Sequence, residues 1–267
     1  MLYVYAILPA TARAVRTLAQ GGVTGIDGGT VGSVAAGELA AAVSEVPSEE
    51  FEAEPLNRLV NSMDWLGPRA AQHQQVNAAL FGETDALAPL SFGTVYRDRA
   101  GVTGVLTAQQ QPLSAALQRL RGRAEWVASL HRDVNQALTT LEQHNAALRD
   151  LRSAIAGGAP GRAYLLARQV ETVQRRELLA LDGQAVAALD ALRAGTDATF
   201  AESLEAGSVN GLLARLSILV PRTAESIWLS TAEGYRQHWL PLGYELRLTG
   251  PWPPYRFSRQ EAELLRV

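Results

Sequence analysis

The sequence predicts an α+β protein of two domains, the C-terminal one a ferredoxin-like βαββαβ domain with a long helical hairpin inserted in its first crossover. Three observations predict this fold class. The chain has 267 residues, enough for two ordinary domains. Short runs with two-residue apolar alternation and longer runs with helical spacing follow each other throughout. In the second half these runs come in the order strand, helices, strand, strand, helix, strand.

The composition excludes several kinds of site. The chain has no cysteine, so neither a disulfide framework nor a thiolate metal site is possible. All 24 Lys or Arg residues are arginine, which excludes a lysine Schiff base and a P-loop lysine. The formal net charge of −3 argues against a general nucleic-acid surface. We therefore expect no nucleic-acid partner, no metal and no cofactor.

The first element is an apolar run at residues 2–9. It alternates along its length but is apolar on both faces, which predicts a strand in the centre of a sheet. It has no basic region before it and no convincing cleavage pattern after it, so we do not interpret it as a signal peptide. No apolar run approaches the roughly 20 residues that span a bilayer, and we expect a soluble protein with no membrane contact.

A helix at residues 12–20 and a glycine-rich loop at residues 21–30 follow. A helix separates these glycines from the first strand, and the loop lacks a Gly-Lys-Ser/Thr ending and a Rossmann spacing. We therefore predict a turn rather than a phosphate-binding site. Residues 31–36 and 39–46 read as a hairpin about Gly37, closed by Pro47.

Helical sequence begins at residues 48–50, where acidic side chains suit the positive end of the helix dipole. Apolar residues then recur at helical spacing up to Leu66, and Gly67-Pro68 predicts a break between two helices. The second helix carries His73, the one histidine whose neighbours suggest catalysis, together with Asp64. No serine nucleophile stands in a recognisable context, so we expect His73 at the edge of the core, bonded to backbone or to Asp64.

The first domain ends with a short strand and a helix. Residues 87–96 predict one strand, with Pro89 suited to a strand entry or an edge. Pro112 predicts the start of a helix with Leu113, Leu117 and Leu120 facing inward, and Gly122 ends it. We place the first domain at residues 1–122, the second at 123–257 and a tail at 258–267.

The second domain opens with a strand at residues 126–130. Two long amphipathic helices, residues 134–155 and 166–192, are joined by a glycine-rich turn at residues 157–161 and should form an antiparallel hairpin. Either it is an insertion packed on itself or it is an arm for a partner, and the first is commoner. The remaining predictions are strands at residues 199–204 and 212–220 around a turn at 207–211, a helix at 224–239 with apolar positions Ile227 and Leu229, and a last strand at 242–249.

The chain then enters an aromatic and proline-rich stretch. Prolines fix φ and remove backbone donors, so we expect the strand to stop and an extended, polyproline-like arm to follow. Such an arm either packs on its own domain or meets a protein partner, and buried aromatics are commoner than binding ones. The candidate partner-binding residues are Trp252, Pro253, Pro254, Tyr255 and Phe257.

Several motifs, in this order, resemble the gas vesicle protein F/L family (GvpL/GvpF) over nearly the whole chain. The closing stretch, residues 248–257, is the most specific of them. The sequence departs from the family after Trp126, where residues 127–130 are Val-Ala-Ser-Leu instead of Gly-Val-Lys-Val, which affects only a strand. The other motifs are Tyr3-Val4-Tyr5, Gly25-Ile26, Val43-Ser44-Glu45-Val46-Pro47, Trp65-Leu66 with His73 and Val76, Leu90 with Phe92-Gly93-Thr94, Glu125-Trp126 and Gly161-Arg162-Ala163-Tyr164-Leu165.

The resemblance implies a non-enzymatic accessory or minor structural protein of gas vesicles, located at the gas vesicle and in the cytoplasm. It implies binding to the small, very hydrophobic major shell protein and to other accessory proteins during assembly, and it implies no catalytic residues. Two other functions stay open from the residues alone. One is a small-molecule-binding or regulatory protein, since ferredoxin-like domains often bind ligands, and the other is a hydrolase that uses His73 with Asp64.

Overall fold

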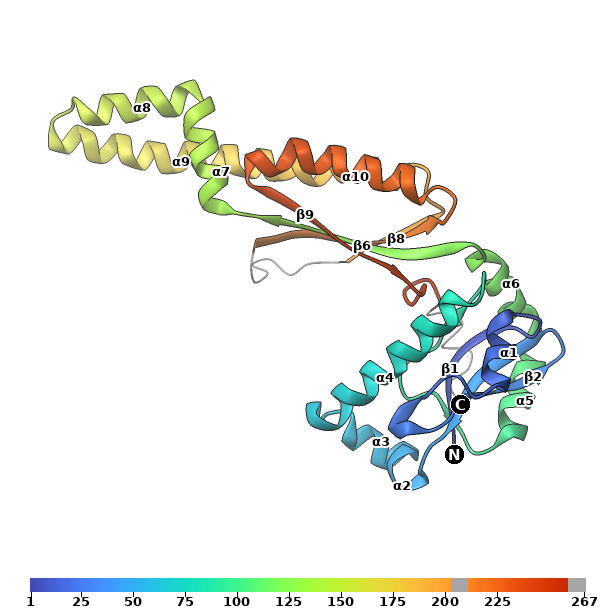
Figure 1. Cartoon of the computed structure of the whole chain (residues 1–267). Coiled ribbons are helices and arrows are strands. Elements are labelled where there is room, and N and C mark those ends of the chain that lie inside the picture. The colour runs from blue at the N-terminus through green and yellow to red at the C-terminus, as the bar shows by residue number, and fades with distance from the viewer. Residues whose placement is uncertain (203–210, 259–267) are drawn as a thin grey trace. The chain divides into compact units, whose positions relative to one another are not determined.

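The computed structural model describes residues 1–202 and 211–258 of the chain (Figure 1). The chain forms two compact units. The first contains Met1–Glu125 and the chain from Pro251 onward, and the second is Trp126–Gly250. The first unit is therefore built from both ends of the sequence. The predicted domain limits at residues 122 and 257 stay predictions.

An antiparallel sheet of short and long strands forms the centre of the first unit. Strand β1 (Leu2–Pro9) pairs antiparallel with β3 (Leu39–Glu45), and β3 pairs with β2 (Gly32–Ala36). On its other side β1 pairs with β4 (Ala88–Pro89) and β5 (Val95–Tyr96). The predictions of a central first strand and of a hairpin are confirmed. The single strand expected at 87–96 is wrong, because Thr94 bonds back to the Ser91 carbonyl and interrupts it with a turn.

Six α-helices and a 3₁₀ turn are described in the first unit. Helix α4 is continuous, so the break predicted at Gly67-Pro68 is wrong. Pro68 is only the sixth residue of α4. Because proline has no N–H, one hydrogen bond is missing, the one to the carbonyl of Asp64 near the exposed start of the helix. The predicted inward face of α6 is confirmed, since Leu113, Leu117 and Leu120 are buried. The helices are α1 (Arg13–Ala19), η1 (Ile26–Gly28), α2 (Ser48–Phe51), α3 (Ala53–Leu59), α4 (Met63–Gly82), α5 (Arg99–Ala108) and α6 (Gln110–Leu120).

Helix α5 was not predicted from the sequence. Its apolar stripe is short, with Val102 and Leu106 as its buried residues. Its start is defined by Asp98, whose side chain accepts a hydrogen bond from the Gly101 N–H at 2.8 Å.

The second unit is built on a four-stranded sheet. The strands are β6 (Arg123–Arg132), β7 (Ala198–Ala201), β8 (Leu212–Pro221) and β9 (Tyr244–Trp252), in the spatial order β7-β8-β6-β9. The predicted sequence of strands and helices in this half is confirmed. The turn expected at 207–211 lies mostly outside the described residues, as do the last two residues of the strand expected at 199–204.

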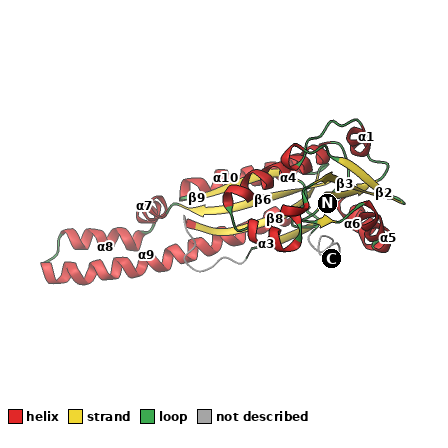
Figure 2. Ribbon diagram, turned by 90° about the horizontal axis from the view of Figure 1, so that it is seen from below, coloured by secondary structure: helices red, strands yellow, loops and turns green. Residues whose placement is uncertain are grey.

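A helical hairpin follows β6 in the second unit. Helices α8 (Ala146–Ala156) and α9 (Pro160–Ala188) lie side by side and are joined by a short loop (Figures 1 and 2). The single first helix expected at 134–155 is wrong, because α7 (Val134–His144) ends before Asn145. The Asn145 side chain caps α8 by accepting from the Leu148 N–H at 3.1 Å.

Helix α10 (Glu225–Trp239) packs on the sheet of the second unit by an aromatic face. Its buried residues are Trp228, Ala232, Tyr235 and Trp239, whereas Ile227 is 72% exposed. The short 3₁₀ segments η2 (Leu189–Arg193) and η4 (Leu240–Leu242) complete this unit. Among the residues that the structure describes, no helix is both long and apolar enough to cross a bilayer.

Candidate functional site

The candidate site lies where the proline-rich C-terminal arm, residues 251–258, packs within the first unit. Strand β9 continues through Pro251 to Trp252, three residues beyond the predicted end at 249, so the expectation that the prolines stop the strand there is wrong. The arm is also not extended. The Tyr255 N–H bonds to the Pro253 carbonyl at 2.7 Å and the Ser258 N–H to the Pro254 carbonyl at 3.0 Å, which folds the arm into consecutive turns.

Three hydrogen bonds fix this arm to the rest of the first unit. The Arg256 N–H donates to Glu125 Oε2 at 2.7 Å. The Arg119 guanidinium donates to the Phe257 carbonyl at 2.9 Å. The fully buried Ser258 hydroxyl donates to the Pro89 carbonyl of β4 at 2.7 Å. The arm is thus an integral part of the first unit.

The five candidate partner-binding residues have different environments. Pro253 and Pro254 are buried, and Tyr255 and Phe257 are half-buried. Trp252 is 46% exposed. Of the five, Trp252 presents the largest apolar surface to solvent, and Tyr255 points into a cavity.

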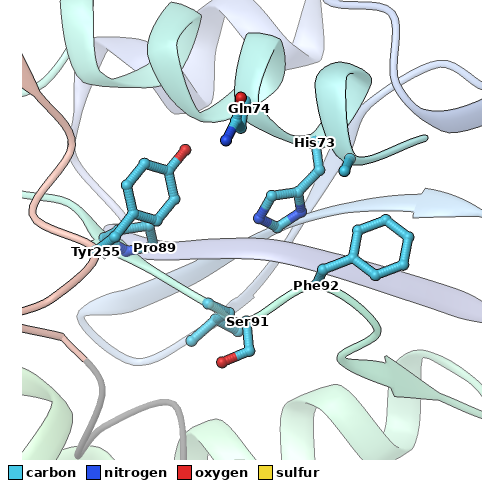
Figure 3. Close-up of a pocket in the computed structure, with 8 residues that line it drawn as sticks. His73, Gln74, Pro89, Ser91, Phe92 and Tyr255 are labelled. Atoms are coloured by element: carbon cyan, nitrogen blue, oxygen red, sulfur yellow. The ribbon is translucent and has the colours of Figure 1, made fainter. Parts of the chain in front are cut away.

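That cavity has a volume of about 320 Å³ and combines three segments of the first unit (Figure 3). Helix α4 supplies His73 and Gln74, and the arm supplies Tyr255. The segment that begins in β4 supplies the opposite wall. The complete lining is Ala70, His73, Gln74, Pro89, Leu90, Ser91, Phe92 and Tyr255.

His73 is held from both ring nitrogens. Its Nδ1 lies 2.9 Å from Tyr3 Oη and its Nε2 lies 3.0 Å from Asn77 Nδ2. The side chain is buried, and the loss of solvent lowers the pKa of His73 to about 4, so the imidazole is neutral at pH 7. Tyr3 and Asn77 thus hold the imidazole from its two nitrogens.

His73 was expected to bond to the backbone or to Asp64. The backbone contact is present, at Leu90, but the pairing with Asp64 is wrong. Asp64 is exposed near the start of α4, nine residues before the buried His73, so the two are separated by about 14 Å along the helix axis. The cavity lining includes Ser91 but no carboxylate. The arrangement therefore lacks the acid–base pair that a hydrolase with His73 and Asp64 would need.

Aromatic side chains pack around His73. The Tyr3 ring centroid lies 5.7 Å from that of His73 and 5.9 Å from that of Phe51. Phe92 lies 5.7 Å from Tyr3, and Tyr5 stacks near His73 at 5.8 Å. These aromatic contacts fix the orientation of the imidazole.

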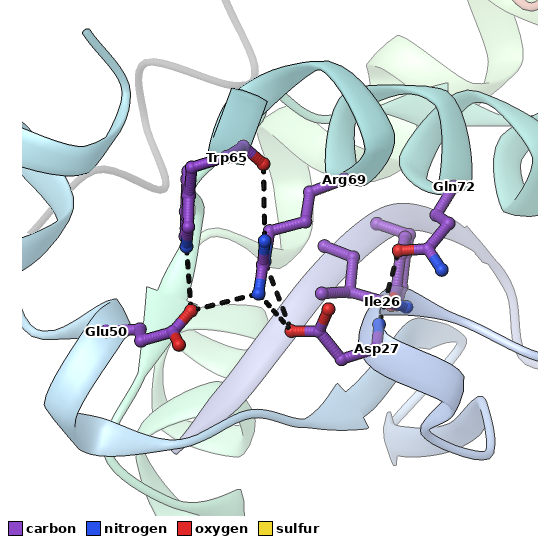
Figure 4. A network of polar contacts seen from close by, with 7 residues as sticks. Ile26, Asp27, Glu50, Trp65, Arg69 and Gln72 are labelled. Carbon is purple, nitrogen blue, oxygen red and sulfur yellow. Dashed lines mark hydrogen bonds and ion pairs between the residues drawn. The ribbon is translucent and has the colours of Figure 1, made fainter. Parts of the chain in front are cut away.

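A polar network on the surface ties the glycine-rich loop to α4 (Figure 4). Arg69 lies 3.1 Å from both Asp27 and Glu50, and its guanidinium carbon lies 4.6 Å from the Trp65 ring centroid. The Trp65 indole N–H donates to the same Glu50 oxygen at 2.7 Å. This network orients the helix that carries His73.

The loop at 21–30 is a turn, as predicted. Asp27 has a φ of 51° and its N–H bonds to the Gln72 side chain at 3.2 Å. A Cβ atom at Gly25 would collide with the Tyr5 hydroxyl, so a glycine is required there for packing.

Sequence reasoning identified Tyr255 and His73 but did not place them in one cavity. It also missed Tyr3 and Asn77 as partners of His73. Asn77 lies one helical turn after His73, and that spacing was the available signal. Tyr3 comes from the central strand, and periodicity within one segment carries no information on such a contact.

Comparisons of the whole chain with known proteins agree with one another. The sequence model of the family described as gas vesicle synthesis protein GvpL/GvpF matches residues 1–259. The chain is 31% identical to gas vesicle protein L of a Streptomyces species, over 96% of this chain and 92% of that protein. It is 29% identical to gas vesicle protein L2 of Halobacterium salinarum, over 96% and 90% of the two chains.

Two crystal structures share the fold. The gas vesicle protein GvpF of an Anabaena species superposes with a TM-score of 0.64 at 19% identity, covering 97% of this chain and 95% of that one. GvpF of Microcystis aeruginosa superposes with a TM-score of 0.62 at 19% identity, covering 97% and 98%. Both structural similarities extend over the two units.

Proposed function

The chain belongs to the gas vesicle synthesis protein GvpL/GvpF family, and from this premise we propose that it is an accessory or minor structural protein that binds the small hydrophobic shell protein and other accessory proteins during vesicle assembly. The family is one of gas vesicle proteins and is not a known enzyme family. The observation that carries the proposal is the match of the family over residues 1–259, which includes both units and the arm.

A physical reason supports binding of the shell protein. A protein that polymerises into a water-excluding shell must expose apolar surface beforehand, and a partner that covers this surface suppresses aggregation. The exposed Trp252 at the end of β9 offers a rigid aromatic contact for this purpose. We place the protein at the gas vesicle and in the cytoplasm, where assembly would occur.

We also propose that the second unit is a modified ferredoxin-like domain. The strand order β7-β8-β6-β9 and the helical connections after β6 and β8 support this assignment. In this description the hairpin of α8 and α9 enlarges the first crossover. The division into domains at residues 122 and 257 is part of the same proposal.

The test is co-expression of the tagged full-length chain with the small shell protein, followed by affinity pull-down. The full chain is needed because the arm completes the first unit. We expect wild type to retain the shell protein and Trp252→Ser to retain much less. Ile227→Ser is the matched control, since Ile227 is an exposed apolar residue on α10. If folded wild type retains no shell protein, shell binding is refuted.

A second candidate function is binding of a small molecule in the cavity beside His73. The observation that favours it is the set of polar groups from His73, Gln74, Ser91 and Tyr255 around one cavity of about 320 Å³. Native mass spectrometry of the protein purified under mild conditions tests it. A bound compound that is lost from Ala70→Trp, which would fill the cavity, would support this candidate, and an unliganded mass for wild type would exclude a tightly held ligand.

A further inference from the structure

One face of α9 carries apolar side chains that are exposed within the described residues, 1–202 and 211–258. Leu165 and Leu179 are 68% and 65% exposed, and Val186 is 38% exposed. Together with the exposed Thr172 they recur every seven residues. Successive members drift by about 20° around a straight α-helix, so the four lie within a stripe roughly 60° wide.

The opposite face of α9 accounts for the packing of the hairpin. Val170 and Ala185 are buried there, and Leu178 and Leu181 pack against the core of the second unit. The heptad stripe is therefore not needed to hold the hairpin together. Gly183 lies within the stripe, and a Cβ atom there would meet nothing within 4 Å, so the backbone is open to close approach.

The stripe is flanked by positive charge. Arg168 and Arg175 are exposed, lie beside Leu165, Thr172 and Leu179 at helical spacing, and have no ion-pair partner within residues 1–202 and 211–258. The nearby Arg176, in contrast, is paired with Glu177 at 2.6 Å. A partner that covers the stripe would gain from carboxylates opposite Arg168 and Arg175.

We propose that this stripe docks an α-helix of a partner protein, with apolar residues repeating every seven positions and Asp or Glu beside them. Side chains that return to one side of a helix every seven positions form a line along which a second helix can lie. The same stripe of a second copy would bring Arg168 and Arg175 against each other, so like charge disfavours self-association by this face. This partner class rests on the proposed function, because the partner is sought among the proteins that take part in gas vesicle assembly.

Site-specific photo-crosslinking tests the docking. A photoreactive amino acid replaces Thr172 in the full-length chain, in cells that make gas vesicles, and the matched control carries it at Ile227 on α10. We expect Thr172 to give crosslinks to a peptide with the stated apolar repeat and adjacent acids. Crosslinks that reach only a second copy or lipid, or that do not exceed the Ile227 control, overturn the proposal.

Charge exchange provides the second measurement. Arg168→Glu with Arg175→Glu should lower the crosslink yield about tenfold, and changing the acids of the identified peptide to Arg should restore it. Arg16→Glu with Arg58→Glu makes the same change in net charge at two exposed arginines of the first unit and should leave the yield unchanged. Equal losses in both pairs would show that net charge, not this face, controls the crosslink.

The proposed function is tested separately, by vesicle formation in cells that lack the chain. Normal vesicles without the chain refute a role in assembly and leave the crosslink result interpretable by itself. Absent vesicles that return with wild type, combined with a Thr172 crosslink no stronger than the control, support assembly and refute the helix-docking stripe.

Discussion

His73 is a buried neutral imidazole whose two nitrogens both have partners inside the first unit. Burial lowers its pKa from 6.5 to about 4. Between these pH values the unfolded chain binds more protons than the folded one, so the free energy of unfolding must fall as the pH falls from 6.5 to about 4. The loss is bounded at roughly 3 kcal/mol by the size of the shift.

We expect His73→Gln to remove this part of the pH dependence, because a glutamine side chain does not titrate. Urea unfolding at pH 7 and pH 4.5 measures it, with the difference between the two values larger in wild type than in the variant. An NMR titration of the His73 ring should give a midpoint near 4. A midpoint near 6.5 would contradict the buried, neutral state.

Arg69 stabilises the start of α4 through several weak contacts at once. It meets Asp27, Glu50 and the Trp65 ring while its own side chain is largely buried. Its partners are partly exposed, which limits the ion pairs to a small contribution. We expect Arg69→Met to lower the free energy of unfolding by about 1 kcal/mol, from lost pairs and lost cation–π contact.

The control for Arg69→Met is Arg16→Met, at an exposed arginine in the last turn of α1. Thermal and urea unfolding should show a change within about 0.5 kcal/mol for that variant. Equal losses in the two variants would mean that the network around Trp65 adds nothing beyond a general charge effect.

At the scale of elements, local chemistry decided where helices begin and end. Asn145 lies in an apolar stripe that predicts one helix from 134 to 155, yet its side chain caps α8 and divides the stripe. Pro68 predicts a break, yet α4 passes through it. Hydrophobic periodicity identified which segments are helical. Whether a helix starts, stops or continues at a given residue depends on contacts with neighbours that lie outside the segment.

The cap at Asn145 can be tested directly. Asn145→Ala removes the acceptor for the Leu148 N–H and should cost about 1 kcal/mol, whereas Asn145→Asp keeps an acceptor and should cost little. Hydrogen exchange of the first-turn amides of α8 measures the effect locally. Unchanged protection in Asn145→Ala would show that packing of α8 on α9, rather than the cap, fixes the start of the helix.

The candidate site shows the same limit across elements. The sequence placed Tyr255 in an aromatic arm and His73 on a helix, and both placements are confirmed. Their meeting in one cavity depends on the chain returning to the first unit after Gly250. Such a return brings together residues 182 positions apart in the chain, and no spacing in the sequence specifies it.

At the scale of the whole molecule, the first unit is discontinuous: residues 1–125 are completed by the chain from Pro251 onward. During synthesis the arm is made after the entire second unit. The first unit therefore reaches its final packing only when residues 251–258 close on β4 and α6. Until then, the buried Pro89 carbonyl lacks the Ser258 hydroxyl that satisfies it.

Ser258 tests how strongly this closure stabilises the protein. Its side chain is fully buried, and Ser258→Ala leaves the Pro89 carbonyl buried without that donor, so we expect a loss of about 1–2 kcal/mol. Ser62→Ala, at an exposed serine with no side-chain cap bond, should change stability by less than about 0.5 kcal/mol. Urea unfolding gives both values, and hydrogen exchange shows where protection is lost.

We expect the loss of protection in Ser258→Ala to spread to the β1 amides that pair with β4, because the arm is hydrogen-bonded to β4 and β4 to β1. A loss confined to the arm would mean that the arm opens independently and that the first unit is stable without it.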